Sequence, residues 1–345
     1  MRPRLCYRIA LKSKPKGHPM KLVIQLPALN EEASIAQVLR NLPASLPGID
    51  EIVRLVVDDG STDRTAELAR AEGAVVVSHH RNRGVGMAFR TGIAKAAELG
   101  ADLVVTIDAD GQFDVNDIPK LLAPILAGEA DFVTASRFLD PALVPEMPAA
   151  KRWGNDMIAR WLSAITKQTY RDVSCGFRAY SRNAYLRLNL LGTFTYTHEV
   201  FLTLALAEVP IKELPVRVRG VREHGKSRVA SNLFRYAHRT ASIILKTYRD
   251  YRPLHFFGYG GLAFAVVGLA LLGFLAWVRW TTGGFSPHKW AGFAGAGFLA
   301  AAGACWMMGI VSEMLVRIRT AADESLFRIR RLEMQASSLR TPPAR

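Results

Sequence analysis

The stretch "VVTIDADGQFD", Val104 to Asp114, governs the fold prediction, because an apolar strand runs directly into a group of carboxylates. Asp108, Asp110 and Asp114 follow the strand, with Gln112 among them. Like charges gathered at one strand end repel each other, and burying them is costly. Hard oxygen ligands of this kind suit Mg²⁺ or Mn²⁺, which would offset the repulsion. Asp108 and Asp110 would share a face if the strand stayed extended, whereas a bend would separate them.

Around this stretch, residues 22–135 alternate between strand and helix patterns. Strands are predicted at residues 22–27, 52–57, 74–78, 103–110 and 131–137, and a helix at 30–42 carries Glu31 and Glu32 in its first turn. Alternation of this kind predicts an α/β fold with a mostly parallel sheet covered by helices on both faces. In such sheets ligands bind at the carboxyl ends of the strands, where Asp58, Asp59 and Asp108 also lie.

Two apolar segments follow the sheet region. Residues 256–278 and 290–311 contain no charged side chain, and each exceeds the roughly 18 residues expected of a membrane helix. The loop between them has two cations, and the flanks are richer, with Lys246, Arg249 and Arg252 before and Arg317, Arg319, Arg328, Arg330 and Arg331 after. The positive-inside rule therefore predicts an integral inner (cytoplasmic) membrane protein with two spans, and with the sheet domain and both termini in the cytoplasm.

The chain divides into five predicted parts. Residues 1–19 form a disordered basic tail, 20–228 the sheet domain, 229–253 an amphipathic helix, 254–316 the transmembrane hairpin and 317–345 a cytoplasmic basic tail. The amphipathic helix lies in the membrane interface or packs on the sheet domain. A net charge of +15 fits an anionic membrane surface. Binding of nucleic acid would explain the charge but neither the hairpin nor the acidic strand ends.

Four motifs in the sheet domain resemble a known family. "PALNEE" at 27–32, "VVDDGSTD" at 56–63, "RNRGVGMA" at 81–88 and "DADGQ" at 108–112 occur in the order typical of family 2 glycosyltransferases with a GT-A fold. Further motifs are similar to those of the polyprenyl-phosphate glycosyltransferases, which include dolichyl-phosphate mannose synthases and undecaprenyl-phosphate glucosyltransferases. They are "SRF" at 136–138, "KRWGN" at 151–155, "DVSCGFRAY" at 172–180 and "HGKSR" at 224–228.

The resemblance implies a membrane-bound, metal-dependent hexosyltransferase that takes a UDP- or GDP-linked sugar as donor. The implied donor-binding residues are Pro27, Leu29, Glu31, Asp58, Asp59, Gly86, Asp108 and Ala109. Asp110 and Gln112 would hold the Mg²⁺ or Mn²⁺ ion. The metal would stabilise the departing diphosphate as a Lewis acid.

The implied acceptor is a polyprenyl (undecaprenyl or dolichyl) monophosphate. With a second pKa of about 6 it is largely dianionic at neutral pH, so it needs cations more than a general base. The candidate cations are Arg137, Lys151, Arg152, Arg178 and Arg228. Asp172 corresponds to a residue proposed as a base in relatives, and both proton transfer and positioning stay open for it. Asp110, Asp172 and Arg137 form the expected catalytic set, and direct attack on the anomeric carbon implies inversion.

Two other functions are weighed against this one. A processive polysaccharide synthase is disfavoured because the QxxRW motif is absent and only two spans are predicted. A non-catalytic membrane sensor of nucleotide sugars is disfavoured because Asp108, Asp110 and Gln112 are all present. The sugar, the choice between UDP and GDP, the polyprenol length and the formation of a homo-oligomer are left open.

Overall fold

The computed structural model describes residues 19–145, 147, 149–190, 196–219, 245, 248–250 and 252–340. These fall into two compact units: a sheet unit, Met1–Ser231 with Leu326–Arg345, and a hairpin unit, Asn232–Ser325. Most of the predicted basic tail at 1–19, most of the predicted amphipathic helix at 229–253, and Arg228 lie outside the described residues.

The sheet unit is built on a seven-stranded sheet with the order β3-β2-β1-β4-β6-β5-β7. The strands are β1 (Lys21–Ala28), β2 (Glu51–Asp58), β3 (Val75–Ser78), β4 (Leu103–Thr106), β5 (Phe132–Ser136), β6 (Arg178–Ser181) and β7 (Ile211–Pro215). Only β6 runs antiparallel to its neighbours, β4 and β5. The predicted mostly parallel sheet is therefore confirmed.

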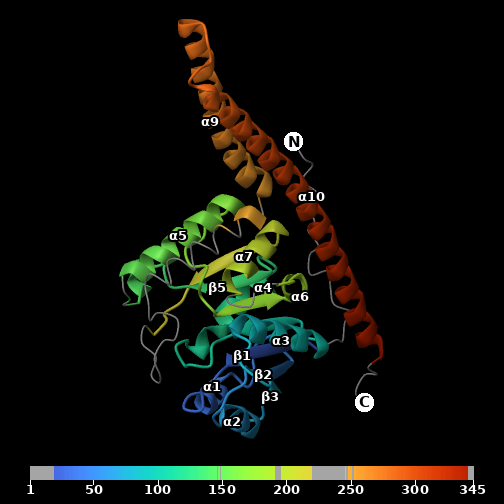
Figure 1. Cartoon of the computed structure of the whole chain (residues 1–345). Helices are drawn as coiled ribbons and strands as arrows, with labels where there is room; N and C mark the ends of the chain where they lie inside the picture. Colours follow the sequence, from blue (N-terminus) through green and yellow to red (C-terminus); the bar gives the residue numbers. More distant parts are fainter. Residues whose placement is uncertain are drawn as a thin grey trace. The chain divides into compact units, whose positions relative to one another are not determined.

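Helices cover both faces of this sheet (Figure 1). They are α1 (Ile35–Asn41), α2 (Thr65–Ala71), α3 (Val85–Glu98), α4 (Ile118–Leu126), α5 (Ala149–Thr166), α6 (Arg182–Leu186) and α7 (Thr197–Leu206). Ile24 of β1 belongs to the apolar core shared with α1 and α4, whereas the neighbouring Gln25 points to α3. This alternation of side chains along β1 lets one strand contact helices on opposite faces.

The first helix begins later than the sequence pattern predicts. It starts at Ile35, because Asn30 takes a positive φ of 53° and breaks the helical path. Glu31 and Glu32 therefore do not lie in its first turn, which contains no acidic residue. Glu32 instead accepts the backbone N–H of Arg64 at 3.2 Å, which ties this loop to the start of α2.

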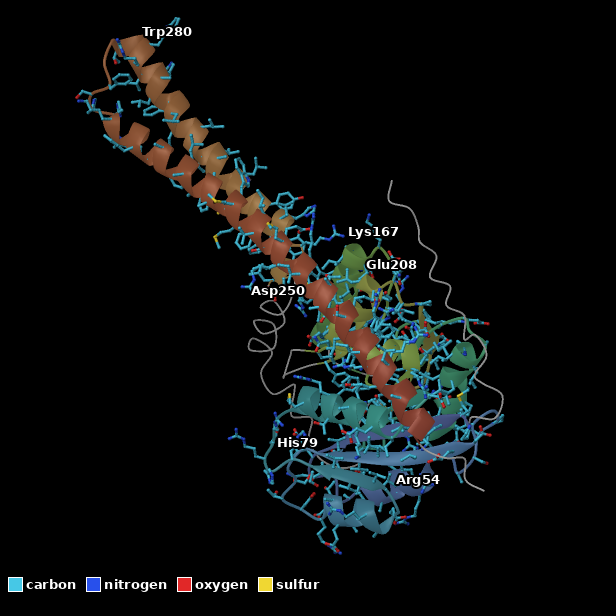
Figure 2. The ribbon with its side chains drawn as sticks, turned by 90° about the vertical axis from the view of Figure 1, so that its right-hand side faces the viewer. Arg54, His79, Lys167, Glu208, Asp250 and Trp280 are labelled. Atoms are coloured by element: carbon cyan, nitrogen blue, oxygen red, sulfur yellow. The ribbon has the colours of Figure 1, made fainter. Side chains whose placement is uncertain are left out.

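The hairpin unit contains α9 (Pro253–Thr282) and the first part of α10 (Lys289–Arg340). Both are long and apolar enough to cross a membrane, as predicted. The two helices lie side by side, and Trp280, 90% exposed, marks the end where they are connected (Figure 2). They pack through small residues, because a Cβ at Gly268 would lie 2.9 Å from the carbonyl oxygen of Gly295.

Helix α10 continues well past the predicted span. Its 52 residues correspond to about 78 Å at a rise of 1.5 Å per residue, against about 30 Å for a hydrocarbon core. The segment expected as a basic tail is thus helical as far as Arg340. Its last part belongs to the sheet unit, where Phe327 and Met334 are buried and Arg330 donates to the carbonyl oxygens of Leu186 and Leu188 at 3.1 and 3.0 Å.

Candidate active site

The acidic turn after β4 separates its two aspartates. The strand ends at Thr106, and a turn follows at Ala109 and Asp110, so Asp108 and Asp110 do not share the face that an extended strand would give them. The carboxylate of Asp108 lies against Gly176, where a Cβ would be 2.9 Å from its Oδ2. Asp110 lines a cavity on the side of α1. The bend thus gives the two carboxylates different neighbours.

The cavity beside Asp110 has a volume of about 610 Å³ and a mainly polar lining. Its polar lining residues include Ser34, Gln37, Asn41, Asp114, Asn116 and Arg219. Asp110 is 5% exposed, and its Oδ1 accepts the backbone N–H of Gln112 at 3.1 Å. The amide of Gln112 donates through Nε2 to the carbonyl oxygen of Arg219 at 3.1 Å. These contacts fix the two predicted metal ligands next to each other in the turn.

The residues present fit a hard divalent cation that is held partly by a substrate. Among the described residues no three His, Cys, Asp or Glu side chains group as a metal site. Mg²⁺ is commonly bound by one or two carboxylates together with waters and substrate phosphates, so a complete protein cage is not required. Asp110 would supply a carboxylate oxygen and Gln112 an amide oxygen, both of the ligand class that Mg²⁺ and Mn²⁺ prefer.

Asp114, the third carboxylate of the opening stretch, has a structural contact. Its Oδ1 accepts the backbone N–H of Asn116 at 2.9 Å and caps the short 3₁₀ helix η1 (Val115–Asp117). Short polar side chains before a helical turn commonly act in this way. The carboxylate thus stabilises the chain that leaves the acidic turn.

Asp58 and Asp59, at the carboxyl end of β2, are 4% and 3% exposed. Asp59 accepts the backbone N–H groups of Arg83 and Gly84 at 3.0 and 2.8 Å and contacts Nδ1 of His79 at 2.7 Å. These bonds hold the loop that opens α3. Asp58 accepts the N–H of Ser61 at 2.9 Å within its own turn. Turn chemistry therefore accounts for the contact of Asp58, whereas Asp59 joins the end of β2 to the loop before α3.

The remaining predicted donor residues lie around the same sheet edge. In the β1–β2 register Pro27 is opposite Val57, and Ala28 is opposite Asp58, so the two strand ends are adjacent. Ser34 donates to the carbonyl oxygen of Ala109 at 2.8 Å and to a carboxylate oxygen of Glu31 at 3.3 Å, which links α1 to the acidic turn. Leu29 is half-buried, and Gly86 is buried in the first turn of α3.

Arg137 and Asp172 form a buried bidentate ion pair. Nε and Nη2 of Arg137 donate to the two carboxylate oxygens of Asp172 at 2.7 and 2.9 Å, and the backbone N–H of Arg137 donates at 3.0 Å. Burial alone would raise the pKa of Asp172, but the hydrogen bonds and charge of Arg137 outweigh it and lower that pKa. The guanidinium pKa is raised for the same reason, since Asp172 outweighs the effect of burial.

A carboxylate that the sequence analysis missed supports this pair. Glu213, on β7, accepts the backbone N–H groups of Arg171 and Asp172, both at 2.8 Å. Burial is the main reason that its own pKa is raised. Ser174, which receives Nη2 of Arg137 at 2.7 Å, donates to Asn155 of α5 at 2.6 Å. No local motif marks Glu213, because its partners are about 40 residues away in sequence.

Of the other predicted acceptor cations, the structure describes the side chains of Arg178 and Arg152. Arg178 is fully buried and donates to the carbonyl oxygens of Val173, Cys175 and Thr197, so no surface of it is presented to a phosphate. The contacts of Arg178 are those of a structural residue. Arg152 is exposed on α5. The structure does not describe the side chain of Lys151 or any part of Arg228.

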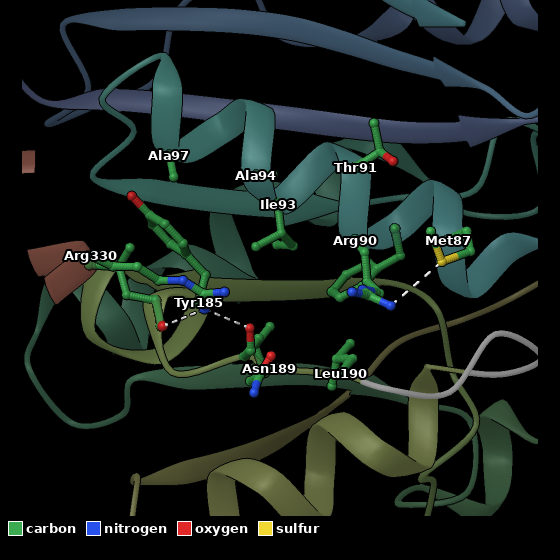
Figure 3. Close-up of a pocket in the computed structure, with 13 residues that line it drawn as sticks. Met87, Arg90, Thr91, Ile93, Ala94, Ala97, Tyr185, Asn189, Leu190 and Arg330 are labelled. Carbon is green, nitrogen blue, oxygen red and sulfur yellow. Dashed lines mark hydrogen bonds between the residues drawn. The ribbon is translucent and has the colours of Figure 1, made fainter. Parts of the chain in front are cut away.

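A second cavity of about 280 Å³ lies between α3 and the segment after α6 (Figure 3). Apolar side chains such as Ile93, Leu188 and Leu190 line it, together with Arg90 and Arg330. None of the predicted site residues belongs to its lining. The acidic turn and its polar cavity therefore remain the candidate active site.

Comparison with known proteins identifies the family of the sheet unit. The family model "Glycosyl transferase family 2" matches residues 23–188, which span all of the strand ends described above except that of β7. UDP-N-acetylglucosamine–dolichyl-phosphate N-acetylglucosaminyltransferase of Methanococcus voltae is 34% identical over 46% of this chain and 68% of its own. Dodecaprenyl-phosphate galacturonate synthase of Rhizobium johnstonii is 27% identical over 89% of this chain and 90% of its own.

A solved structure supports the fold. Glucosyl-3-phosphoglycerate synthase from Mycobacterium tuberculosis, crystallised with Mn²⁺, UDP-glucose and phosphoglyceric acid, has a TM-score of 0.50 and 24% identity. The similarity covers 66% of this chain and 79% of that one. At this identity the likeness concerns the arrangement of strands and helices.

Proposed function

Because the chain belongs to glycosyl transferase family 2, we propose that it is a membrane-bound inverting transferase that moves a sugar from a nucleotide sugar to a polyprenyl monophosphate. The observation that carries this proposal is the acidic turn after β4, where Asp110 opens onto a polar cavity at the carboxyl edge of the sheet. Two relatives are named for transfer to polyprenyl phosphates but for different sugars, which supports the acceptor class and leaves the sugar open.

In this proposal the donor lies along the edge formed by β1, β2 and β4. Asp110 and Gln112 hold the divalent cation, which when bound supplies Lewis-acid stabilisation of the departing diphosphate. Asp108 faces the opposite side of the turn, next to the Gly176 loop, and orients the sugar-diphosphate there. The buried carboxylates of Asp58 and Asp59 shape the two loops that border the nucleoside, so their contribution to donor binding is positional.

The chemical step exchanges one bond at the anomeric carbon for another. An oxygen of the acceptor phosphate attacks that carbon, the bond to the diphosphate oxygen breaks, and the nucleoside diphosphate leaves with the electron pair. No general base is needed, because the phosphate is already ionised. We therefore assign Asp172 the role of holding Arg137, in keeping with a carboxylate whose pKa is lowered and whose two oxygens accept from Arg137.

Arg137 is the proposed contact for the acceptor phosphate. Its Nε and Nη2 atoms donate to Asp172 and Ser174, and Nη1 makes no hydrogen bond to the residues that the structure describes. A guanidinium fixed on one side presents the other to an oxyanion with little loss of side-chain freedom. The apolar helices α9 and α10 would hold the protein at the bilayer that contains the polyprenyl chain.

The test is transfer by membranes that contain the full chain. They are incubated with a panel of labelled UDP- and GDP-sugars, Mg²⁺ or Mn²⁺, and polyprenyl phosphate, and the lipid is extracted. We expect label in the lipid with one donor, no label when free polyprenol replaces the phosphate, and loss of label with Asp110→Asn or excess EDTA. Label in a polymer would favour the processive synthase, and nucleotide binding without transfer would favour the sensor.

A further inference from the structure

Helix α10 contacts other elements in two places, first where it packs on α9 in the hairpin unit and again near its end in the sheet unit. In a heptad frame abcdefg with Ile329 at position a, Phe298 at position e contacts Phe264 of α9. Most other residues of α10 that touch neighbouring elements occupy positions b and f, which we call the b/f face. In the hairpin unit these are Gly295, Leu299, Ala302, Trp306 and Gly309, which meet α9. In the sheet unit they are Phe327, Arg330 and Met334, of which Phe327 and Met334 are 6% and 8% exposed.

The opposite face of α10 carries a second apolar stripe, which we call the a/d seam. Its a positions are Met308, Leu315, Ala322 and Ile329, and its d positions are Val311, Ile318, Ser325 and Leu332. At 100° per residue the centre of this stripe lies roughly 150° from the centre of the b/f face. Every residue of the seam is exposed.

The part of the seam beyond Arg317 is not explained by contact with lipid. The uncharged span ends before Glu313, and Arg317 and Arg319 follow, yet Ile318, Ile329 and Leu332 remain 65%, 52% and 64% exposed. Helix α10 runs from Lys289 to Arg340 and contains no proline, so the seam is helical on both sides of Arg317. Apolar residues repeated at a and d favour a coiled coil.

We propose that the a/d seam pairs with the same seam of a second copy of this chain, as a parallel two-stranded coiled coil. Two copies inserted in one membrane have the same orientation, so their α10 helices run parallel. In that arrangement position g of one helix lies near position e of the next heptad on the other. Arg328 occupies g and Glu333 occupies e, which gives two complementary ion pairs per dimer.

The pairing leaves the b/f face available for the contacts already described. Phe327 packs under Arg187, whose guanidinium carbon lies 3.9 Å from the ring centroid, and this contact lies across the helix from Ile329. The small residues Ala322 and Ser325 at the centre of the seam permit close approach of the two helices. The proposal depends on membrane insertion by α9 and α10 and not on the transfer reaction. Cross-linking therefore tests the pairing of the helices, and the transfer assay tests the proposed function separately.

The test is cysteine cross-linking of the full chain in native membranes. Cys6 and Cys305 are replaced by serine, and Cys175, which is buried, is kept. Single cysteines are placed at Ile318 or Ile329 on the seam, and at Thr320 as the matched control. Thr320 is equally exposed on the same helix but occupies position f. We expect oxidation to convert most of the seam variants to covalent dimer while Thr320→Cys stays monomeric.

A charge exchange separates coiled-coil pairing from adsorption of the helix on lipid. Arg328→Glu and Glu333→Arg should each reduce cross-linking through Ile329→Cys, because each places like charges in apposition. The double variant should restore it. Equal cross-linking at Ile329 and Thr320, a monomeric mass for the wild type in mild detergent, or a double variant no better than the single ones would overturn the proposal. Loss of cross-linking with Glu333→Arg but not with Arg328→Glu would also overturn the proposal, because it would indicate that added positive charge draws the helix to the lipid surface.

Discussion

The ion pair between Arg137 and Asp172 makes the site sensitive to one buried carboxylate. Asp172 is fully buried, and its two oxygens accept three N–H groups of Arg137. Removing one partner of a buried ion pair leaves the other without compensation, which typically costs about 3–5 kcal/mol. We expect Asp172→Asn to lower the free energy of unfolding by that amount at neutral pH, measured by chemical unfolding of the full chain in detergent.

The effect should depend on pH in a defined direction. The pKa of Asp172 is lowered from its ordinary value of 3.8, so its stabilisation is present above that value and is lost as pH falls through the lower folded value. The difference between wild type and Asp172→Asn should therefore be constant from neutral pH to about pH 5 and shrink only in stronger acid. Asp140→Asn, which removes a carboxylate that accepts one backbone N–H, is the control. A difference that shrinks near neutral pH would contradict this account.

Gly176 sets how closely the "DVSCGFRAY" loop approaches the acidic turn. A Cβ at this position would lie 2.9 and 3.0 Å from the two carboxylate oxygens of Asp108. Since a displacement of about 1 Å at a reacting centre can cost up to 10²-fold in rate, we expect Gly176→Ala to reduce kcat/KM at least tenfold. Gly258→Ala, where a Cβ meets nothing within 4 Å, should leave it unchanged. Equal effects of the two variants on kcat/KM would contradict the assignment of Asp108 to the active site.

At the scale of single residues the sequence predicted positions better than contacts. The carboxylates of Asp58, Asp108 and Asp110 were expected at strand ends and are found there, because the end of an apolar run is a local signal. What Asp59 touches depends on a loop 20 residues away, and what Arg178 touches depends on three carbonyl groups brought in by folding. Such partners leave no local pattern.

At the scale of elements, the alternation of strands and helices predicted a mostly parallel sheet but not the order of the strands within it. The antiparallel β6 lies between β4 and β5, where Tyr180 is in register with Val104 on one side and with Phe132 on the other. A long-range pairing of this kind is decided by tertiary contacts. The length of α10 was also underestimated, because the charged residues after Val311 ended the apolar run without ending the helix.

Packing of α9 on α10 depends on glycines at their contact. A Cβ at Gly268 would lie 2.9 Å from the carbonyl oxygen of Gly295 and 3.0 Å from Leu299, so a large side chain must separate the helices. Without a hydrophobic driving force inside the bilayer, close packing is the main attraction between spans. We expect Gly268→Ile to lower the midpoint of thermal unfolding in detergent by several degrees, about the effect of 1–2 kcal/mol. Gly273→Ile, where nothing lies within 4 Å, is the matched control, and an equal shift would contradict the packing account.

At the scale of the whole molecule, the distribution of charge predicts how the chain lies in a bilayer. The connection between α9 and α10 carries Arg279 and Lys289. In the sequence, eight cations stand before the first span or after the second, at Lys246, Arg249, Arg252, Arg317, Arg319, Arg328, Arg330 and Arg331. Cytoplasmic flanks retain Lys and Arg more readily than translocated loops do. The connection should therefore face the outside, with the sheet unit and both termini in the cytoplasm.

Labelling with a membrane-impermeant maleimide tests this arrangement in the background with Cys6 and Cys305 replaced by serine. Ser286→Cys lies in the connection between the spans, and Arg70→Cys is an exposed control on α2 of the sheet unit. In intact cells we expect label at Ser286→Cys alone, and at both positions after permeabilisation. The donor nucleotide sugar and the proposed acceptor phosphate would then meet the acidic turn on the cytoplasmic side. Label at Arg70→Cys in intact cells would show that the sheet unit faces the outside. The reaction would then need an external source of nucleotide sugar, which would count against the proposed function.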